Sequence, residues 1–92
     1  MEEEGHVVTA EDLMSAVRDR IDGVEHVQAE DESGGCGAMF NLIVVSEVFK
    51  GKPLLVQQRM VNTALKEEIA QIHAITVKTK TPEQWSKMQA GL

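Results

Sequence analysis

The chain has 92 residues, a formal net charge of -6 and 42% hydrophobic residues. This length supports one domain with a modest core that needs neither disulfides nor a structural metal, and we expect no second domain. The acidic balance argues against a general nucleic-acid-binding protein, because nucleic acid is bound by basic surfaces. Residues 1–46 carry two basic and eleven acidic side chains, whereas residues 47–92 carry seven and four. An anionic partner would therefore meet the second half of the chain.

The cysteine content and the first residues indicate the compartment. A single cysteine cannot form an internal disulfide, and Met1 is followed by three glutamates instead of a basic and then apolar leader. No apolar run approaches the roughly 20 residues of a membrane helix. We therefore expect a protein that is neither secreted nor bound to a membrane, located in the cytoplasm with the nucleus as a second compartment.

The first segments of the chain suggest a tail, a helix and a strand. Residues 1–8 are predicted to form a flexible acidic tail, and residues 9–92 a single domain. Thr9 is suited to cap a helix that ends at Gly23, with Asp12 as capping-box partner. The buried face of this helix is predicted to consist of Leu13, Met14, Val17 and Ile21.

Two strands are predicted next. Residues 24–32 alternate, which is typical of an exposed edge strand, and His26 is interpreted as a surface residue of that strand. Residues 33–37 contain three glycines and form a loop that holds Cys36 away from a packed core. Residues 39–49 are mostly apolar on both faces, which indicates a central strand.

Helices and a third strand complete the pattern. Pro53 is suited to the first turn of a helix that runs to about Leu65 and breaks into two near residues 62–66. Its apolar residues predict a core face, made of Val56, Met60, Val61, Ala64 and Leu65. A strand begins after His73, with Ile75, Val77 and Thr79 toward the core. Thr81 and Pro82 then open a last helix, which Trp85 packs onto the body.

The predicted topology brings two residues of chemical interest together. A short loop makes the first two strands an antiparallel hairpin, and the long helical connection favours a parallel pair of second and third strands. Parallel neighbours begin at the same edge of a sheet. Cys36 precedes one of these strands and His73 opens the other, so both residues are predicted to reach one solvent-facing region.

Spacing alone leaves the role of this pair open. Thiolate and imidazole suit zinc, copper or an iron-sulfur cluster, but two ligands do not complete a site, so a partner would have to supply the rest. A Cys-His nucleophile pair is a second interpretation, for which the sequence offers no orienting group or oxyanion donors. The third interpretation is an incidental loop cysteine and a histidine bonded to backbone.

Five sequence motifs carry a family resemblance, namely FNLIVVS (40–46), FKGKPLL (49–55), RMVN (59–62), IHA (72–74) and KTKTPEQW (78–85). As a set they resemble the BolA-like family, most closely its cytosolic eukaryotic branch with a cysteine in the first hairpin loop. The resemblance covers about residues 9–88. It implies an α+β fold of order αββααβα, with a three-stranded mixed sheet related to class II KH domains.

The resemblance also implies a function. Members of this branch are non-catalytic partners of monothiol glutaredoxins in cytosolic iron-sulfur cluster assembly, transfer and iron or redox regulation. A labile two-iron, two-sulfur cluster is held between the two proteins, and none is expected on the isolated monomer. The glutaredoxin supplies its cysteine and a glutathione thiolate, and this chain would supply His73 and Cys36. Such mixed ligation at an exposed interface favours a cluster that is passed on or sensed.

Three further expectations concern partners and modification. The basic residues of the second half are candidates for a docking surface, namely Lys50, Lys52, Arg59, Lys78 and Lys80. The family often carries a histidine-containing or basic run where this chain has Gln57-Gln58, so no second histidine on that helix can assist His73. Cys36 is expected to be open to oxidation or glutathionylation, and to link two chains by a disulfide under oxidising conditions.

Nucleic-acid binding and transcriptional regulation is the alternative function. KH domains grip the nucleic-acid backbone with a Gly-x-x-Gly loop between two helices. The only such spacing here, Gly34 to Gly37, lies between two strands and contains no basic residue. Residues 62–65, at the predicted junction of the middle helices, contain no glycine, and the total charge is acidic. The sequence therefore disfavours this alternative.

Overall fold

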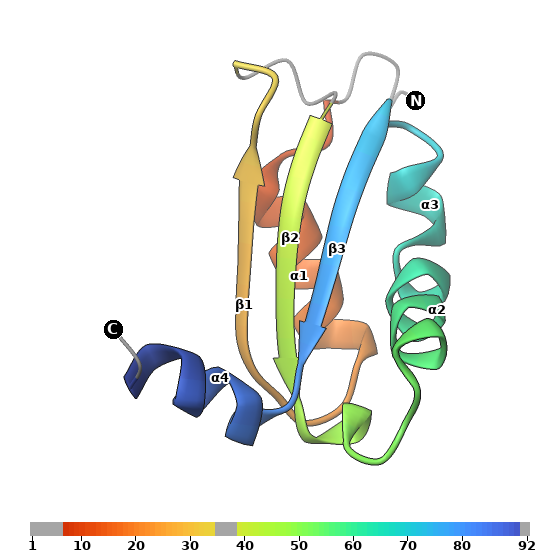
Figure 1. Cartoon of the computed structure of the whole chain (residues 1–92). Helices are drawn as coiled ribbons and strands as arrows, with labels where there is room; N and C mark the ends of the chain where they lie inside the picture. Colours follow the sequence, from red (N-terminus) through yellow and green to blue (C-terminus); the bar gives the residue numbers. More distant parts are fainter. Residues whose placement is uncertain (1–6, 35–38, 91–92) are drawn as a thin grey trace.

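The computed structural model describes residues 7–34 and 39–90 and has one three-stranded sheet with helices packed against it (Figure 1). In chain order the elements are α1 (Ala10–Arg20), β1 (Val24–Asp31), β2 (Met39–Ser46), the 3-10 helix η1 (Glu47–Phe49), α2 (Leu54–Ala64), α3 (Lys66–Ile69), β3 (Ala74–Lys80) and α4 (Pro82–Ala90). The predicted α+β class and the order αββααβα are confirmed. Within the described residues, no helix has the length and apolar character needed to cross a membrane.

Helix α1 begins with the predicted capping box. The Thr9 hydroxyl accepts a hydrogen bond from the Asp12 N–H at 3.1 Å, and the Asp12 carboxylate accepts one from the Thr9 N–H at 3.0 Å. These bonds satisfy two amide donors that a helix start would otherwise leave unpaired. Val8 is only 3% exposed and belongs to the core. The packed domain therefore includes Val8, one residue before the predicted boundary.

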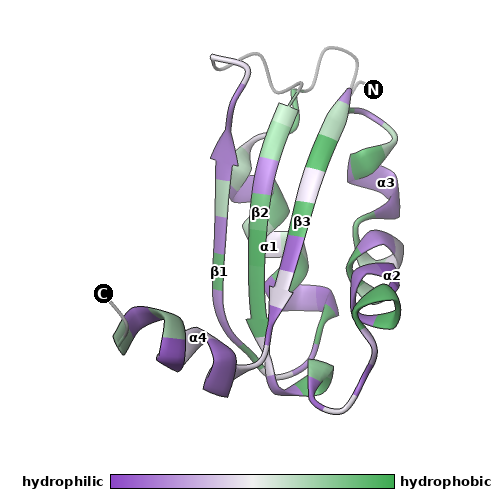
Figure 2. Ribbon diagram, viewed as in Figure 1, coloured by the Kyte–Doolittle hydropathy of each residue, from purple (hydrophilic) through white to green (hydrophobic). Residues whose placement is uncertain are grey.

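The sheet has β2 at its centre. Its order is β1-β2-β3, with β1 antiparallel and β3 parallel to β2, as predicted. Figure 2 shows the hydrophobic residues concentrated along most of β2, whereas β1 and β3 alternate. The main core lies between the sheet and the helices α1 and α2. Its fully buried side chains include Leu13, Val17, Leu42, Val44, Phe49, Val61 and Leu65.

Strand β2 is shorter than the sequence predicted. It ends at Ser46, and residues Glu47–Phe49 form η1 instead of continuing the strand. The Ser46 hydroxyl donates to the Asp22 carbonyl at 2.6 Å and accepts from the Val48 N–H at 3.1 Å. A buried serine that caps the following turn in this way takes the chain out of the sheet ladder.

Helix α2 packs most of the predicted face against the core, with Met60 and Ala64 partly buried there, and only Val56 departs from the prediction. Val61 and Leu65 are fully buried, but Val56 is 37% exposed, and a glutamine, Gln57, occupies the core side of the first turns. Burying an amide is favourable only when its polar atoms are hydrogen-bonded. Gln57 meets this condition, because its Nε2 donates to the Phe49 and Lys52 carbonyls and its Oε1 accepts from the Thr79 hydroxyl.

Helix α4 packs on the outer face of the sheet, opposite the main core. Its first turn is capped by Thr81, whose hydroxyl accepts from the Gln84 N–H at 3.2 Å. Trp85 stacks on His26 of β1 with ring centroids 4.8 Å apart and planes 21° apart. Val45, the register partner of His26, is fully buried. Trp85 therefore attaches α4 to the body as predicted, and His26 is part of that attachment.

Candidate functional site

The edge of the sheet at which β2 and β3 begin is the candidate site. Met39, the first residue of β2, pairs with Ala74, the first residue of β3, and Phe40 pairs with Ile75. The two strands thus start side by side, at the top of the sheet in Figure 1. The predicted common edge is confirmed, and His73 lies at it as the residue before Ala74.

A short turn after α3 presents His73 to solvent. The N–H groups of Gln71 and Ile72 donate to the carbonyls of Glu68 and Ile69 at 3.0 and 3.2 Å. Ile72 is partly buried and packs against the core, and so does Ile75 three residues later. The chain is held on both sides of His73, whose own side chain is exposed. An exposed imidazole held in this way is accessible to a second protein.

Helix α3, which leads to this turn, is itself fixed to α1. Arg20 donates to both carboxylate oxygens of Glu68, at 2.9 and 3.1 Å, and to the Ala64 carbonyl at 2.7 Å. The hydrogen bonding to Glu68 and the negative charge of Glu68 raise the pKa of Arg20 above its ordinary value. The bidentate contact between Arg20 and Glu68 fixes the direction of the chain that leads to His73.

The hairpin between β1 and β2 leaves from the same edge. The Glu32 N–H donates to the Met39 carbonyl at 2.8 Å and closes the loop of residues 33–38. At its start, the Asp31 carboxylate accepts from the Ser33 N–H at 2.9 Å. Cys36, predicted as the second ligand, belongs to this loop but lies outside the described residues. The structure therefore shows where its loop is anchored, next to the start of β3.

The described residues do not form a metal site by themselves. Within 7–34 and 39–90 there is no group of three or more histidine, cysteine, aspartate or glutamate side chains that could hold an ion. A cluster with four protein or thiolate ligands would thus need most of its ligands from elsewhere. What the described edge offers to such a group is one accessible imidazole, that of His73.

The sequence did not predict two features of the surface next to His73: exposed apolar side chains and a buried amide oxygen without a hydrogen-bond partner among the described residues. Met39 is 44% exposed on the outer face of the sheet, and the neighbouring Ala74 is also exposed. Behind them, the Asn41 Nδ2 donates to the Glu32 carboxylate at 3.4 Å, while its buried Oδ1 has no hydrogen-bond partner among the described residues. The position of Met39 at the entrance of an apolar strand was the available signal. A partner at this edge would cover both groups.

The five candidate cations lie away from His73. Lys78 and Lys80 occupy the second half of β3, and a strand advances about 3.3 Å per residue, so Lys80 lies about 20 Å from Ala74. Lys50 and Lys52 lie in the turn before α2, at the opposite end of the sheet (Figure 1), and Arg59 is on α2. The structure does not gather these cations around the His73 edge.

The Gln57-Gln58 pair has a structural role. Gln58 donates from Nε2 to the Val77 carbonyl at 3.1 Å. It faces the middle of β3, three residues beyond the strand's entrance. The pair joins α2 to β3.

The comparison with known proteins agrees with the motifs. The sequence model for BolA-like proteins matches residues 15–84. The chain belongs to the BolA-like family. It is 45% identical over 80 residues to Protein BOLA2 of Arabidopsis thaliana, covering 86% of this chain and 85% of that protein. It is 43% identical over 81 residues to BolA-like protein 2 of Saccharomyces cerevisiae, covering 88% and 68%.

Solved structures of the family share the fold. A bol-like protein from Babesia bovis superposes with a TM-score of 0.80 at 40% identity, covering 92% of this chain and 98% of that one. Yeast Fra2 gives a TM-score of 0.72 at 43% identity, covering 88% and 87%. The turn that carries His73 lies within the residues 15–84 that the family model matches.

Proposed function

We propose that this BolA-like chain is a non-catalytic partner of monothiol glutaredoxins and shares a labile two-iron, two-sulfur cluster with them. The observation that carries the proposal is the exposed His73 at the edge where β2 and β3 begin, with the Cys36 loop anchored to the neighbouring strand. The glutaredoxin partnership comes from the resemblance to the cytosolic eukaryotic branch. The proposed role is cluster assembly, transfer and iron or redox regulation in the cytoplasm.

In this proposal the chain contributes ligands and a docking edge. His73 would provide one imidazole ligand and Cys36 one thiolate, and the partner would provide its cysteine and glutathione. The cluster would supply a redox-active and exchangeable iron centre. Held by two proteins, it can leave when they separate, which suits transfer or sensing. Met39 and Ala74 offer apolar contact beside the ligand.

The structure offers less support for nucleic-acid binding. Among the described residues, the junction between α2 and α3 is the buried Leu65 with a negative φ, and positive φ values occur only at Gly23, Gly34 and Gly51. A Gly-x-x-Gly loop at that junction would need a flexible, exposed backbone. We therefore keep nucleic acid as an outcome of the test and not as a second proposal.

The test is anaerobic cluster reconstitution with a monothiol glutaredoxin and glutathione, followed by visible circular dichroism. The wild-type mixture should give a spectrum distinct from that of the glutaredoxin alone, and His73→Ala should abolish it. Cys36→Ala then reports whether the thiol is a ligand. His26→Gln is the matched control, because His26 lies on β1 against α4 and not at the His73 edge.

A second readout separates ligand loss from docking loss. Calorimetric titration of the cluster-free proteins should show similar affinity for wild type and His73→Ala if the imidazole acts as a ligand. If no variant changes the glutaredoxin spectrum and wild type does not either, the shared-cluster proposal is wrong. Salt-dependent retention on nucleic acid would then point to the alternative function.

A further inference from the structure

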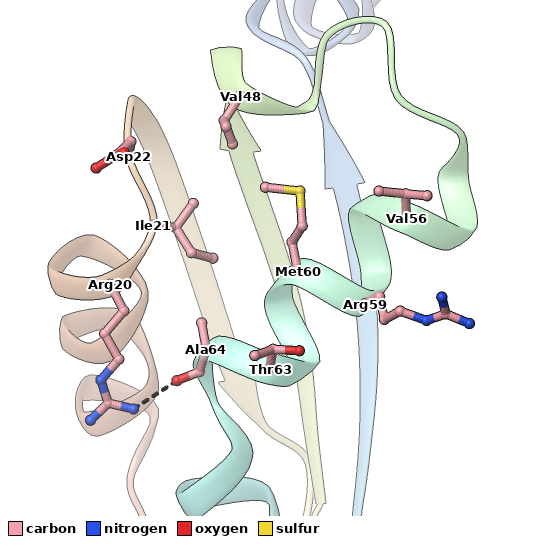
Figure 3. A pocket seen from close by; sticks show the side chains of 9 residues that line it. All are labelled: Arg20, Ile21, Asp22, Val48, Val56, Arg59, Met60, Thr63 and Ala64. Carbon is pink, nitrogen blue, oxygen red and sulfur yellow. Dashed lines mark hydrogen bonds between the residues drawn. The ribbon is translucent and has the colours of Figure 1, made fainter.

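A groove on the opposite side of the molecule from the outer sheet face is not used by the proposed function. It lies between the end of α1, η1 and α2, and has a volume of about 460 Å³. Figure 3 shows the apolar side chains that line it, among them Ile21, Val48 and Met60, which point into the space between the elements. His73 does not line this groove.

Part of the apolar face of α2 borders the groove as well as the core. Val56, Met60 and Ala64 line the groove, and Met60 and Ala64 also pack against the core. These three recur at every fourth residue and form one stripe along the helix. Met60 and Ala64 are partly buried and Val56 is 37% exposed, so the stripe is still accessible to solvent.

The apolar surface extends past the groove at the start of α2. Leu54 and Leu55 are 60% and 65% exposed, the highest values among the large exposed apolar side chains of the described residues. Single exposed leucines are ordinary, and neither of these two lines the groove. Leu55 directly precedes Val56, however, and adds exposed apolar surface at that end of the groove.

The charges around this surface favour an acidic partner. No acidic residue lies in the first turn of α2, whose free N–H groups carry partial positive charge, and Lys50 and Lys52 precede it. Arg59 is exposed on the next turn from Leu55, and its guanidinium points away from the groove floor (Figure 3). No hydrogen bond or ion pair of Arg59 is present among the described residues.

Two other charged residues line the groove, Arg20 and Asp22. Arg20 is already bound to Glu68 and to the Ala64 carbonyl, so its charge is largely compensated. The Asp22 carboxylate lies on the far side from α2 and points outward in Figure 3. On the α2 side of the groove, residues 50–65 contain basic residues and no acidic one, so the charge on that side is positive.

We infer that this groove docks an acidic amphipathic helix of a partner protein, through a surface independent of the His73 edge. Residues spaced by four along α2 present a row into which apolar side chains at i, i+3 and i+7 of a second helix fit. Acidic side chains flanking that apolar row would meet Arg59, Lys52 and the start of α2. A partner bound here would leave the other end of the sheet free.

The test uses two synthetic helical peptides of about four turns. The first carries leucines at i, i+3, i+4 and i+7 with glutamates on both flanks, and the second is identical except that lysine replaces glutamate. Binding is measured by fluorescence anisotropy and mapped by backbone amide shifts of the labelled full chain. The acidic peptide should shift Val48, Met60 and Thr63, and bind about tenfold more tightly than the basic one.

Variants at two surface positions test the site without disturbing the core. Val56→Asp should lower the affinity for the acidic peptide by about tenfold. Arg59→Glu should reverse the preference of the chain for the acidic over the basic peptide, whereas Arg59→Lys should retain it. His73→Ala should bind the peptide like wild type, and Val56→Asp should reconstitute a cluster like wild type. The failure of one proposal is thus visible separately from the failure of the other.

Three results would overturn the inference. Equal binding of both peptides would remove the argument from charge, and shifts confined to the outer sheet face would place binding elsewhere. In sedimentation experiments, a wild-type dimer that Val56→Asp dissociates would assign the groove to a second copy of this chain.

Discussion

Replacing Gln57 by leucine should destabilise the domain strongly while leaving its surface intact. The side chain is 8% exposed and makes three hydrogen bonds, to the carbonyls of Phe49 and Lys52 at 3.1 and 2.8 Å and with the Thr79 hydroxyl at 2.6 Å. A hydrogen bond contributes about 1 kcal/mol net to stability. Gln57→Leu should therefore lower the free energy of unfolding by about 3 kcal/mol, out of the roughly 5–15 kcal/mol of a small domain.

Urea denaturation followed by far-ultraviolet circular dichroism measures this loss. With a slope of about 1–3 kcal/mol/M, the midpoint should fall by about 1–3 M. Thr79→Val, which leaves the Gln57 Oε1 unpaired, should cost about 1–3 kcal/mol. The double variant should lose less unfolding free energy than the sum of the two single losses, because neither partner of the Gln57–Thr79 hydrogen bond remains. A Gln57→Leu variant within about 0.5 kcal/mol of wild type, or strictly additive costs, would refute the assignment.

Two other contacts give testable expectations. Trp85 is the single tryptophan, and its ring stacks on His26. His26→Ala should therefore shift the tryptophan fluorescence emission to longer wavelength and destabilise the attachment of α4 by about 0.5–1.5 kcal/mol. An unchanged emission spectrum would contradict the stacking. Arg20→Gln should lower the urea midpoint. The pKa of Arg20 is raised on folding, so the stabilisation by its positive charge is complete at lower pH and is lost only in strong alkali. The difference in urea midpoint between wild type and Arg20→Gln that is due to this charge should therefore stay constant between pH 7 and pH 10. A difference that shrinks across this range would contradict the prediction.

The sequence predicted those features that depend on neighbouring residues. The Thr9 cap and the alternation after His73 are local signals, and both were confirmed. The placement of His73 at the sheet edge also followed, because a hairpin and a helical crossover leave few arrangements of three strands. The predicted ligand Cys36 lies outside the described residues, so its role stays a prediction.

The features that were missed depend on tertiary contacts. The 3-10 turn at Glu47–Phe49 requires the bond from Ser46 to a carbonyl twenty-four residues earlier, which no local pattern reveals. The fourfold apolar spacing on α2 correctly identified a stripe, but the position of β3 decides which side of the helix is buried, and Gln57 is there. The five candidate cations all belong to the second half of the chain, yet β3 runs away from His73 and carries Lys80 to the far end.

The bond from Gln58 to the Val77 carbonyl has a consequence for the solubility of the protein. A sheet of three strands has two edges, and an unpaired edge can recruit a strand from another chain. At β3, helix α2 and the Gln58 amide occupy a carbonyl that an incoming strand would need. At β1, exposed Glu25 and Glu30 place negative charge along the other edge. Strand addition is thus disfavoured at β3 by an occupied carbonyl and at β1 by negative charge. Loss of the Gln58 amide would free the Val77 carbonyl of β3 for pairing with another chain and so favour aggregation.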